Sequence, residues 1–509
     1  MIRSQPLPDM VLALEQHRAG RLAEAEQAYE AMLRIAPDNA DALNLLGSLR
    51  KSQGRLTEAI ALATQAAQSA PDRADIRYNL GNACLAAGDA AGAQAAFRAA
   101  LDRDPRHVEA ATNLAICLSG VGELDEAAAF YEAALAIDPL HKTANLNLAN
   151  LLVDLGRHES AIGLLRNAVA RWPDLAEAHY NLGLCLMRLG DFGNGLPAFE
   201  WRWRATGFAS PARHTRLPAW DGRPFRGQTL LLHAEQGFGD TLQFVRFATM
   251  AATLGGSITL EVPAVLLRLL KDIQGVDRFV GVEGAAGRHD WQAPLMSLPH
   301  RLGLTMGSIP ASTAYLVAET DRVAAWRSRL RPDGRPIIAL NWQGNKASPV
   351  DAGRSLDGPA ALEPLASIPN VRFVSVCRLP PEDLRRSSTP TGWAVAAAPF
   401  ELEYPGLEYD TGPDAFLDAA AILALSHQVV TTDTAIAHLA GAMGRPGLLL
   451  LKAVADWRWF VNRRDTPWYP SLRLVRQPKA GQFRPAIEEA ARLLASRLSF
   501  RSVGHPDGL

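Results

Sequence analysis

A spacing of 34 residues recurs through about the first 200 of the 509 residues and restricts the fold more than any other feature of the chain. Apolar residues recur every three or four positions around a glycine in each period, which predicts two helices joined by a glycine turn. The glycines, small alanines and prolines that keep this register are Gly20, Gly54, Gly88, Gly122, Gly156 and Gly190; Ala25, Ala59, Ala93, Ala127 and Ala161; Pro37, Pro71, Pro105, Pro139 and Pro173. Each helix pair leaves an apolar face that only a neighbouring pair can cover, so we expect one stacked solenoid with a concave groove.

The period of helix, glycine turn, helix and proline is similar to the tetratricopeptide repeat. We count six units over residues 1–204, and the last is incomplete because Pro197 interrupts its second helix. This resemblance implies a platform that docks other proteins rather than a catalytic domain.

A column of asparagines follows the same spacing. Asn79, Asn113, Asn147 and Asn181 are each 34 residues apart and would form a ladder on a stacked array. The amide of asparagine both donates and accepts hydrogen bonds, so the ladder predicts binding of an extended protein segment through its backbone. The alternative is that each amide bonds within its own helix pair.

Composition excludes several classes of protein. The chain carries 52 Lys and Arg against 53 Asp and Glu, and its net charge of −1 gives no overall field for holding nucleic acid. No apolar run reaches the ~20 residues of a membrane helix, and the N-terminal stretch lacks the pattern of a signal peptide. We therefore expect a cytoplasmic protein with no transmembrane segment and no nucleic-acid partner.

The four cysteines are widely separated and match neither a disulfide framework nor the spacing of a zinc site. We expect them to be buried thiols. They are Cys84, Cys117, Cys185 and Cys377.

The pattern changes after residue 204. Residues 205–227 are rich in Pro, Gly and Arg and lack periodicity, which indicates a linker. Short apolar runs then alternate with amphipathic helical stretches in two series, 228–333 and 334–509, and each series supplies enough strands for a parallel sheet covered by helices. We therefore predict an α-helical solenoid followed by two Rossmann-like α/β domains that face one another across a cleft.

Ligands of open parallel sheets bind beyond the carboxyl ends of the strands, so the loops after three expected strands form the candidate site. Loop one is residues 235–240. Its glycines, Gly237 and Gly239, let the backbone approach a ligand, and Asp240 arrives at the start of a helix. Asp240 either caps that helix, whose positive end lowers the pKa of the carboxyl, or takes a proton from an acceptor hydroxyl. Glu235 is the substitute candidate for that proton.

Loop two, residues 341–356, predicts an anion site. It begins at Asn341 and carries Lys346 and Arg354 directly after a strand, with Gly344 allowing a tight backbone path. Cations in this place would neutralise a phosphate leaving group as its charge develops. The alternative for each of them is a solvated surface cation.

Loop three, residues 431–446, carries the most specific pattern of the three. A buried strand runs into a helix of small residues that ends at a glycine and a proline. The free N–H groups of Thr434 and Ala435 at the helix start, together with the Thr434 hydroxyl, predict a cradle for an anion. Asp433 either caps the helix or bonds sugar or ribose hydroxyls, and His438 either packs internally or contributes to binding.

The run from Asp433 to Pro446 reads Asp-Thr-Ala-x-x-His-Leu-Ala-Gly-Ala-x-Gly-x-Pro and resembles the nucleotide-sugar signature of the family 9 glycosyltransferases, which include the bacterial heptosyltransferases. The Gly-Asp start of the helix after loop one matches the position of that family's proposed base. With the N-terminal repeats, the EWRWR segment at 200–204 and the DWRWFVNRRDTPWYP segment at 456–470, the chain looks like the bacterial repeat-containing protein glycosyltransferases, including those that modify flagellin.

This resemblance, over some 270 residues, implies a GT-B fold and an inverting reaction that needs neither a metal nor a cofactor beyond the nucleotide-sugar substrate. It implies Asp240 as the base. The residues that would hold the donor are Gly239, Asn341, Gly344, Lys346, Arg354, Asp433, Thr434, Ala435 and His438.

We therefore expect a glycosyltransferase that moves a sugar to a Ser or Thr hydroxyl of a protein docked on the repeats, with flagellin as a candidate acceptor. Domain 228–333 would face the acceptor and domain 334–509 the donor. Two alternatives stay open. One is a heptosyltransferase-like enzyme with a saccharide or lipid-linked acceptor, and the other is a non-catalytic repeat scaffold whose α/β pair binds a nucleotide or a partner. The donor nucleotide, its sugar and the acceptor protein are not identified by the sequence.

Overall fold

The computed structural model describes residues 9–208, 210–284, 286–310, 314–348 and 351–499. The chain divides into two compact units, residues 1–178 and 179–509. The ends of the predicted domains 1–204 and 334–509, residues 1–8 and 500–509, lie outside the described residues.

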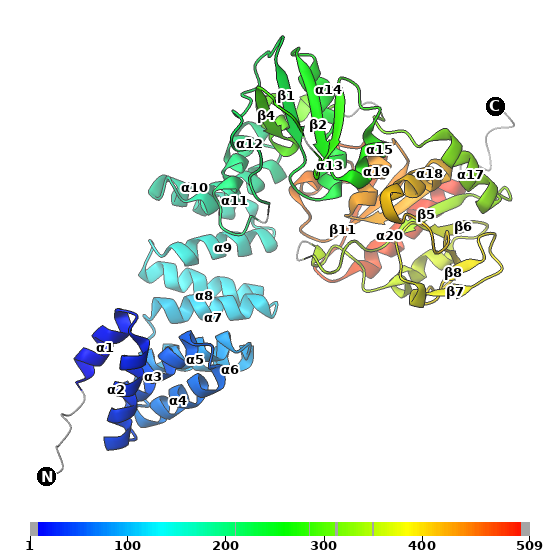
Figure 1. Ribbon diagram of the computed structural model, residues 1–509. Helices are drawn as coiled ribbons and strands as arrows, with labels where there is room; N and C mark the ends of the chain where they lie inside the picture. Colours follow the sequence, from blue (N-terminus) through cyan, green and yellow to red (C-terminus); the bar gives the residue numbers. More distant parts are fainter. Residues whose placement is uncertain (1–8, 209, 285, 311–313, 349–350, 500–509) are drawn as a thin grey trace. The chain divides into compact units, whose positions relative to one another are not determined.

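The first unit consists of antiparallel helix pairs that follow one another in chain order (Figure 1). Its helices within the described residues are α1 (Met10–Arg18), α2 (Leu22–Ile35), α3 (Ala40–Ser52), α4 (Leu56–Ser69), α5 (Ala74–Ala86), α6 (Ala90–Arg103), α7 (Val108–Gly120), α8 (Leu124–Ile137), α9 (Lys142–Asp154) and α10 (His158–Arg171). The sequence prediction of stacked helix pairs is confirmed.

The residues that keep the 34-residue register have the predicted roles. The six repeat glycines all adopt positive φ, between 74° and 88°, which side-chain-bearing residues rarely adopt, so each can turn the chain between two helices. The five register alanines are fully buried, where a larger side chain would push the helices of a pair apart.

A sixth pair is formed by α11 (Ala176–Arg188) and α12 (Phe192–Phe199). It falls almost entirely in the second unit, so the compact first unit ends at residue 178, earlier than the repeat boundary at 204 that the sequence suggests. Helix α12 has 8 residues where the earlier second helices of complete pairs have 14, and it ends two residues after Pro197. The missing N–H of proline accounts for this early end.

The second unit contains two sheets. The first has the order β3-β2-β1-β4 with every pair parallel. Its strands are β1 (Thr229–His233), β2 (Ser257–Val262), β3 (Arg278–Gly281) and β4 (Trp291–Pro294), and its helices are α13 (Phe238–Phe244), α14 (Arg246–Ala252), α15 (Leu267–Leu270) and α16 (Leu298–Arg301). The sequence after loop one suggests a single helix. The structure has two helices there, α13 and α14, which are separated at Val245.

The second sheet has the order β12-β11-β10-β5-β6-β9-β8-β7. Its strands are β5 (Ile337–Asn341), β6 (Arg372–Ser375), β7 (Leu384–Arg386), β8 (Trp393–Val395), β9 (Leu402–Glu403), β10 (Gln428–Thr432), β11 (Gly447–Leu451) and β12 (Leu472–Arg476). Its helices are α17 (Thr320–Leu330), α18 (Leu417–Leu425), α19 (Ala435–Ala442) and α20 (Phe483–Ser499).

The expectation of a purely parallel second sheet is wrong at one edge. The pairs β7–β8 and β8–β9 are antiparallel, so the sheet is mixed. These strands have only two or three residues each, too few for an apolar run to reveal them in the sequence. The other pairs of this sheet are parallel, as expected.

One hydrophobic core extends through the second unit and includes buried residues from α12, both sheets and their helices. The four cysteines are buried free thiols, as the sequence predicts. Among the described residues, no helix combines the length and the apolar character that crossing a membrane requires.

Candidate functional site

Loops one and three meet where α13 and α19 begin, and Figure 1 shows these two helices side by side. A Cβ atom added to Gly239 would lie 2.7 Å from His438 Cδ2 and 3.6 Å from the Cα of Ala435. A side chain larger than hydrogen therefore does not fit at position 239. The glycine lets the start of α13 touch α19, which brings two of the three predicted loops together.

Asp240, the predicted base, is held from both sides. Its Oδ1 accepts a hydrogen bond from Arg458 Nη2 at 2.5 Å, and its Oδ2 accepts one from the Gly237 backbone N–H at 3.0 Å. Its side chain is 22% exposed. Burial raises the pKa of this carboxyl above its usual range, and the charge of Arg458 offsets part of that rise. The expectation that the helix start lowers this pKa is therefore wrong, because burial outweighs the helix end.

Arg458 is a buried guanidinium that joins several groups. It donates from Nη1 to Asp456 at 2.8 Å and from Nε to Gln243 Oε1 at 2.7 Å, in addition to its bond with Asp240. Its guanidinium carbon also lies 4.7 Å from the centroid of the Trp457 ring. Burial alone would raise the pKa of Asp456, but the charges of Arg458 and Arg354 hold it well below its usual range. Asp456 is therefore ionised and fixes Arg458.

Arg354 of loop two extends this set of charges to loop three. Its Nη2 lies 3.4 Å from Asp456 Oδ2, and its Nε lies 3.7 Å from Asp433 Oδ2. We call Asp240, Arg458, Asp456, Arg354 and Asp433 the charge network. It has two arginines and three carboxylates, and it brings residues of all three predicted loops into one place.

Asp433 does not cap α19, which corrects one of its two predicted roles. The N-cap residue is Thr434, while Asp433 is 7% exposed and faces Arg354. Burial raises the pKa of Asp433, and the neighbouring Arg354 charge opposes that rise. Bonding to sugar or ribose hydroxyls stays a prediction for this carboxylate.

The end of β5 is hydrogen-bonded to the residues at the start of α19. Asn341 Nδ2 donates to the Thr434 hydroxyl at 2.9 Å and to the Thr431 hydroxyl at 3.2 Å. The Cys377 thiol donates to Asn341 Oδ1 at 3.1 Å, so the orientation of the amide is fixed. Thr434 and Ala435 are only partly buried, and in the described part of the chain their backbone N–H groups donate to no protein acceptor. These N–H groups are thus available at the positive end of a helix, as the predicted cradle requires.

Lys346 and Gly344 lie in a different part of loop two. Lys346 Nζ donates to the Asp357 carbonyl at 3.0 Å, and the Gly344 N–H donates to the Ser355 hydroxyl at 2.8 Å. The loop surrounds its own cavity of about 480 Å³, and Lys346 is one of the residues that line it. Lys346 and Arg354 are therefore not equivalent, since among the described contacts only Arg354 reaches the charge network.

His438 is placed as the packing alternative predicts. It is buried, its Nδ1 lies 3.0 Å from the Tyr469 hydroxyl, and its ring stacks on Trp459 at 5.4 Å between centroids. Burial lowers the pKa of His438 well below its usual value, which keeps the ring neutral. It supports the start of α13 through its contact with Gly239.

Arg202 fixes the other end of loop one. It is fully buried in the 3-10 helix η1 (Glu200–Trp203), and it contacts Glu200 at 2.6 Å and Glu235 at 3.0 Å. Burial raises the pKa of Glu235 to about 7 although Arg202 lowers it. Glu200 also faces a second cation, since Arg301 Nη2 lies 3.4 Å from its Oε2, whereas among the described ion pairs Glu235 faces Arg202 alone.

Arg202 and Arg458 have the same local setting. Each follows an acidic residue and a tryptophan in the pattern acidic-Trp-Arg-Trp, and each lies in a 3-10 turn, η1 or η9 (Trp457–Trp459). Each pairs with the acidic residue two positions before it and with one carboxylate of loop one. Neither arginine was predicted as a site residue, although both acidic-Trp-Arg-Trp segments are visible in the sequence. Their repetition is the signal that would have found them.

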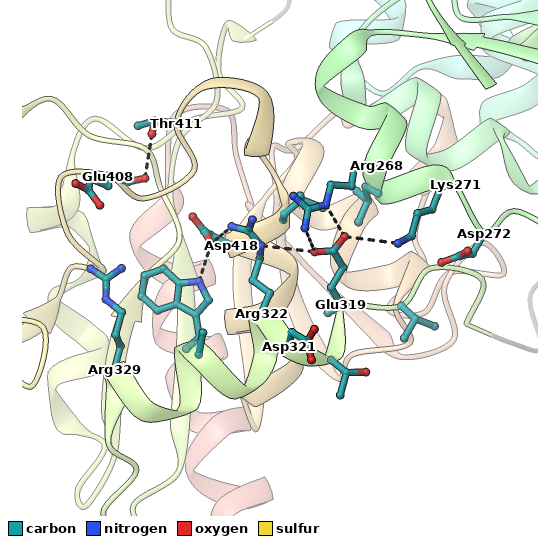
Figure 2. A pocket seen from close by; sticks show the side chains of 17 residues that line it. Arg268, Lys271, Asp272, Glu319, Asp321, Arg322, Arg329, Glu408, Thr411 and Asp418 are labelled. Atoms are coloured by element: carbon teal, nitrogen blue, oxygen red, sulfur yellow. Dashed lines mark hydrogen bonds and ion pairs between the residues drawn. The ribbon is translucent and has the colours of Figure 1, made fainter.

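Another cavity, of about 1060 Å³, lies apart from the predicted residues, between α15, α17 and α18. Figure 2 shows several of its charged side chains bonded to one another around Glu319 and Arg322. Glu319 faces Arg268 at 2.7 Å and Arg322 at 3.8 Å, and Asp418 accepts from Arg322 at 2.7 Å. Opposite charges here compensate each other, so the cavity offers no net attraction to a charged donor.

The asparagine column forms bonds between successive repeats. Asn79 on α5 donates to Asn44 on α3 at 3.0 Å, and Asn113 on α7 donates to Asn82 on α5 at 2.9 Å. The alternative of bonds within one helix pair is therefore wrong for these two. Asn147 on α9 bonds the Tyr131 hydroxyl of α8, and Asn181 lies on α11 in the second unit. Three members, Asn79, Asn113 and Asn147, are partly exposed in the first unit.

Comparison with protein families identifies the class of the N-terminal part. Models of the tetratricopeptide repeat match residues 6–31, 50–95, 78–141, 120–165 and 146–204. The N-terminal part of the chain is therefore a tetratricopeptide-repeat array, as the spacing predicts.

The chain is similar to Protein FlbA of Caulobacter vibrioides, with 26% identity over 330 residues. The match covers 60% of this chain and 53% of FlbA, so the chain spans about half the length of the curated relative it matches. The bacterial source of that relative supports a bacterial origin for this chain.

Solved structures resemble the repeats. YrrB, described as a TPR protein with an unusual peptide-binding site, is 23% identical, and the match covers 33% of this chain and 87% of YrrB with a TM-score of 0.30. PilW, described as a type IV pilus biogenesis factor, is 24% identical, and the match covers 40% of this chain and 93% of PilW with a TM-score of 0.35.

Proposed function

We propose that this chain is a metal-independent, inverting protein glycosyltransferase of the GT-B type. It transfers a sugar from a nucleotide-sugar to a Ser or Thr hydroxyl of a protein held by the repeats. The observation that carries the proposal is the charge network: Asp240 at the end of loop one lies within one set of contacts with Arg354 of loop two and Asp433 of loop three. A base and a phosphate-binding loop must be this close to act on one substrate.

Asp240 is the proposed base. The acceptor hydroxyl oxygen bonds to the anomeric carbon, the bond from that carbon to the nucleotide phosphate breaks, and the hydroxyl proton passes to Asp240. Its raised pKa makes this carboxylate a stronger base than an exposed aspartate. Arg458 keeps it oriented, and the carboxylate has lone pairs left after its two hydrogen bonds.

The leaving nucleotide phosphate gains negative charge as its bond to the sugar breaks. The unpaired N–H groups of Thr434 and Ala435 at the start of α19 would stabilise that charge, with Arg354 beside them. Asn341 fixes the Thr434 hydroxyl, and Lys346 lies further along loop two. Because cationic side chains and a helix end supply the compensation, the proposed step needs no metal.

The repeats are proposed to hold the acceptor. Asn79, Asn113 and Asn147 lie on successive first helices of the array and keep part of their surface exposed. An amide that already bonds a neighbour has further donor and acceptor capacity for the backbone of an extended segment. Flagellin is one candidate acceptor, and this choice rests on the family resemblance alone.

The decisive test is transfer by the purified chain. It is incubated with a panel of nucleotide-sugars and with the secreted and flagellar proteins of a bacterial strain that lacks its gene, and the proteins are analysed by intact-mass spectrometry. A sugar mass on a Ser or Thr of one protein, lost with Asp240→Asn, supports the proposal. Transfer that persists undiminished in Asp240→Asn removes the assigned base.

A non-catalytic scaffold is the second candidate, and one observation favours it. Gly239 is in contact with His438, and both oxygens of Asp240 already accept hydrogen bonds, so the start of α13 is closed against α19. Calorimetry with nucleotides and nucleotide-sugars separates the two candidates. An enzyme binds at least one of them with an affinity that Arg354→Gln weakens, whereas failure of every nucleotide to bind favours the scaffold.

A further inference from the structure

Three arginines surround a cavity of about 340 Å³ at the amino ends of β10, β11 and β12. We call it the arginine cavity. Its lining residues are Arg464, Asp465, Pro470, Ser471, Leu472, Arg473 and Arg497. It lies at the opposite end of these strands from Asp433 and Asp456, which follow the carboxyl ends of β10 and β11. A five-residue strand spans roughly 16 Å, so the arginine cavity is separate from the candidate donor site.

The three arginines reach this cavity from different elements. Arg473 is in the edge strand β12, and Arg464 precedes a short segment that bridges antiparallel to that strand. Arg497 is in the last turns of α20, which packs on β11 and β12. Its Nη1 donates to Gln428 Oε1 at the start of β10, at 2.8 Å. These three cations are separated in sequence, and the fold brings them together.

These guanidinium groups lack a counter-charge. In the described part of the chain, no carboxylate lies within ion-pair distance of Arg464, Arg473 or Arg497. The one carboxylate that lines the cavity, Asp465, is occupied by Arg463, which contacts it from Nε at 3.0 Å and from Nη2 at 2.7 Å. Burial, followed by the nearby charge of Arg473, lowers the pKa of Arg497, as expected for cations placed together without an anion.

Two buried polar atoms at the cavity also have no hydrogen-bond partner among the residues that the structure describes. They are Arg473 Nε and the Ser471 hydroxyl oxygen, and both belong to residues that line the cavity. A buried donor without an acceptor is destabilising, so such atoms in native proteins usually have a bound partner. The two atoms, with two further guanidinium groups, offer donors that converge from several directions.

We propose that the arginine cavity binds the phosphate group of a small phosphorylated molecule or inorganic phosphate. Guanidinium groups and a hydroxyl match the several oxygens of a tetrahedral anion, and charge-assisted hydrogen bonds to phosphate are the strong ones. The cavity is larger than a single phosphate group needs, so it has room for a small organic part as well. This site is independent of the proposed sugar transfer.

The test is titration calorimetry of the full chain with inorganic phosphate and with glycerol 3-phosphate, at low ionic strength. We expect binding of both, and at least a tenfold weaker affinity in Arg473→Gln and in Arg497→Gln. Ser471→Ala weakens binding less, because it removes a neutral partner. Arg484→Gln is the matched control, since Arg484 is on the same helix as Arg497, is 68% exposed and does not line the cavity. Its affinity stays that of the unchanged chain.

Two results of the calorimetry overturn the proposal. One is absence of phosphate binding to the full chain, and the other is an unchanged affinity in both Arg473→Gln and Arg497→Gln. Circular dichroism verifies that the variants fold, and Arg473→Lys, which keeps the charge, regains part of the affinity. A third arm uses phosphatidic acid vesicles. Sedimentation of the chain with vesicles, without binding of either small phosphate, would also overturn the assignment to a small molecule.

Discussion

Arg458 and Asp240 are 218 positions apart in the chain, yet Arg458 Nη2 lies 2.5 Å from Asp240 Oδ1. The pair joins the first sheet's loop one to the segment after β11 of the second sheet. Arg202 makes the equivalent pair with Glu235 at the other end of the same loop. Two acidic-Trp-Arg-Trp turns therefore hold the loop that carries the proposed base, and a loop held at both ends keeps that base oriented.

We predict that Asp240→Asn lowers kcat of sugar transfer by about 10²- to 10⁴-fold, the usual contribution of a positioned base. The amide cannot take up a proton, but it keeps the shape of the carboxylate, so nucleotide binding is retained. In the unchanged chain kcat rises with pH as Asp240 loses its proton, and the rise lies above the usual pKa range of aspartate because burial raises this pKa. Steady-state kinetics between pH 4 and 8 measures both. Asp221→Asn, at an exposed aspartate, keeps full activity.

We predict that Arg458→Met lowers the free energy of unfolding by about 3–5 kcal/mol, because it leaves Asp240 and Asp456 buried without their cation. Arg484→Met, at a surface arginine, changes it by no more than about 0.5 kcal/mol. Denaturant unfolding of the full chain compares the two. Equal effects would mean that Arg458 is not needed to compensate the carboxylates.

The Arg458 variant also has a distinct dependence on pH. The folded pKa of Asp456 is held below its unfolded value, so its stabilisation is present above the unfolded pKa and is lost as pH falls through the folded pKa. Removing Arg458 takes away most of that shift. Acidification below pH 4 therefore costs the variant less stability than it costs the unchanged chain.

Local sequence patterns predicted most of the helices and strands. The 34-residue period predicted the helix pairs, and the apolar runs at 229–235, 336–342 and 427–432 predicted β1, β5 and β10, the strands that precede the three loops. The β7–β9 edge was not predictable, because strands of two or three residues have no measurable period.

The sequence predicted the loops of the site but not its contacts. Asp240, Arg354 and Asp433 were recognised because each lies in a loop that follows an expected strand. Arg458 was not, since its partner Asp240 is distant in sequence and only packing of the two sheets brings them together. The pKa of Asp240 was predicted in the wrong direction for the same reason: burial is a property of the fold, whereas the helix start is visible locally.

We predict that the contribution of Glu235 to the stability of the chain falls as pH rises from about 4 to 7. The folded pKa of about 7 lies above that of an unfolded glutamate, so the folded state binds the proton more tightly, and this contribution is present at low pH and lost above pH 7. It amounts to about 3 kcal/mol at most. Glu235→Gln stays neutral at every pH and removes this part of the pH dependence. Thermal unfolding at several pH values measures it, and parallel curves for the two chains would contradict the prediction.

We predict that Gly239→Ala lowers the free energy of unfolding by about 1–3 kcal/mol, the usual cost of overfilling a packed contact. The added methyl would lie 2.7 Å from His438 Cδ2, and His438 cannot retreat easily because Tyr469 and Trp459 hold its ring. Gly237→Ala is the control in the same loop. Its Cβ would meet Asp240 Oδ2 at an ordinary 3.5 Å, and its φ of −65° suits any residue. Equal stability of the two variants would show that α13 and α19 do not need the close approach.

The last prediction concerns acceptor binding by the asparagine column. Asn113→Ala removes a partly exposed amide that joins two repeats, and we expect KM for the acceptor protein to rise about tenfold with kcat unchanged. Asn145→Ala is the matched control, because Asn145 is buried and its described hydrogen bonds go to the Pro139 and His141 carbonyls just before its own helix. Both variants lose about 1 kcal/mol of stability. The two variants differ in KM only if the column binds the acceptor. Equal KM values would mean that the column serves only to join successive repeats.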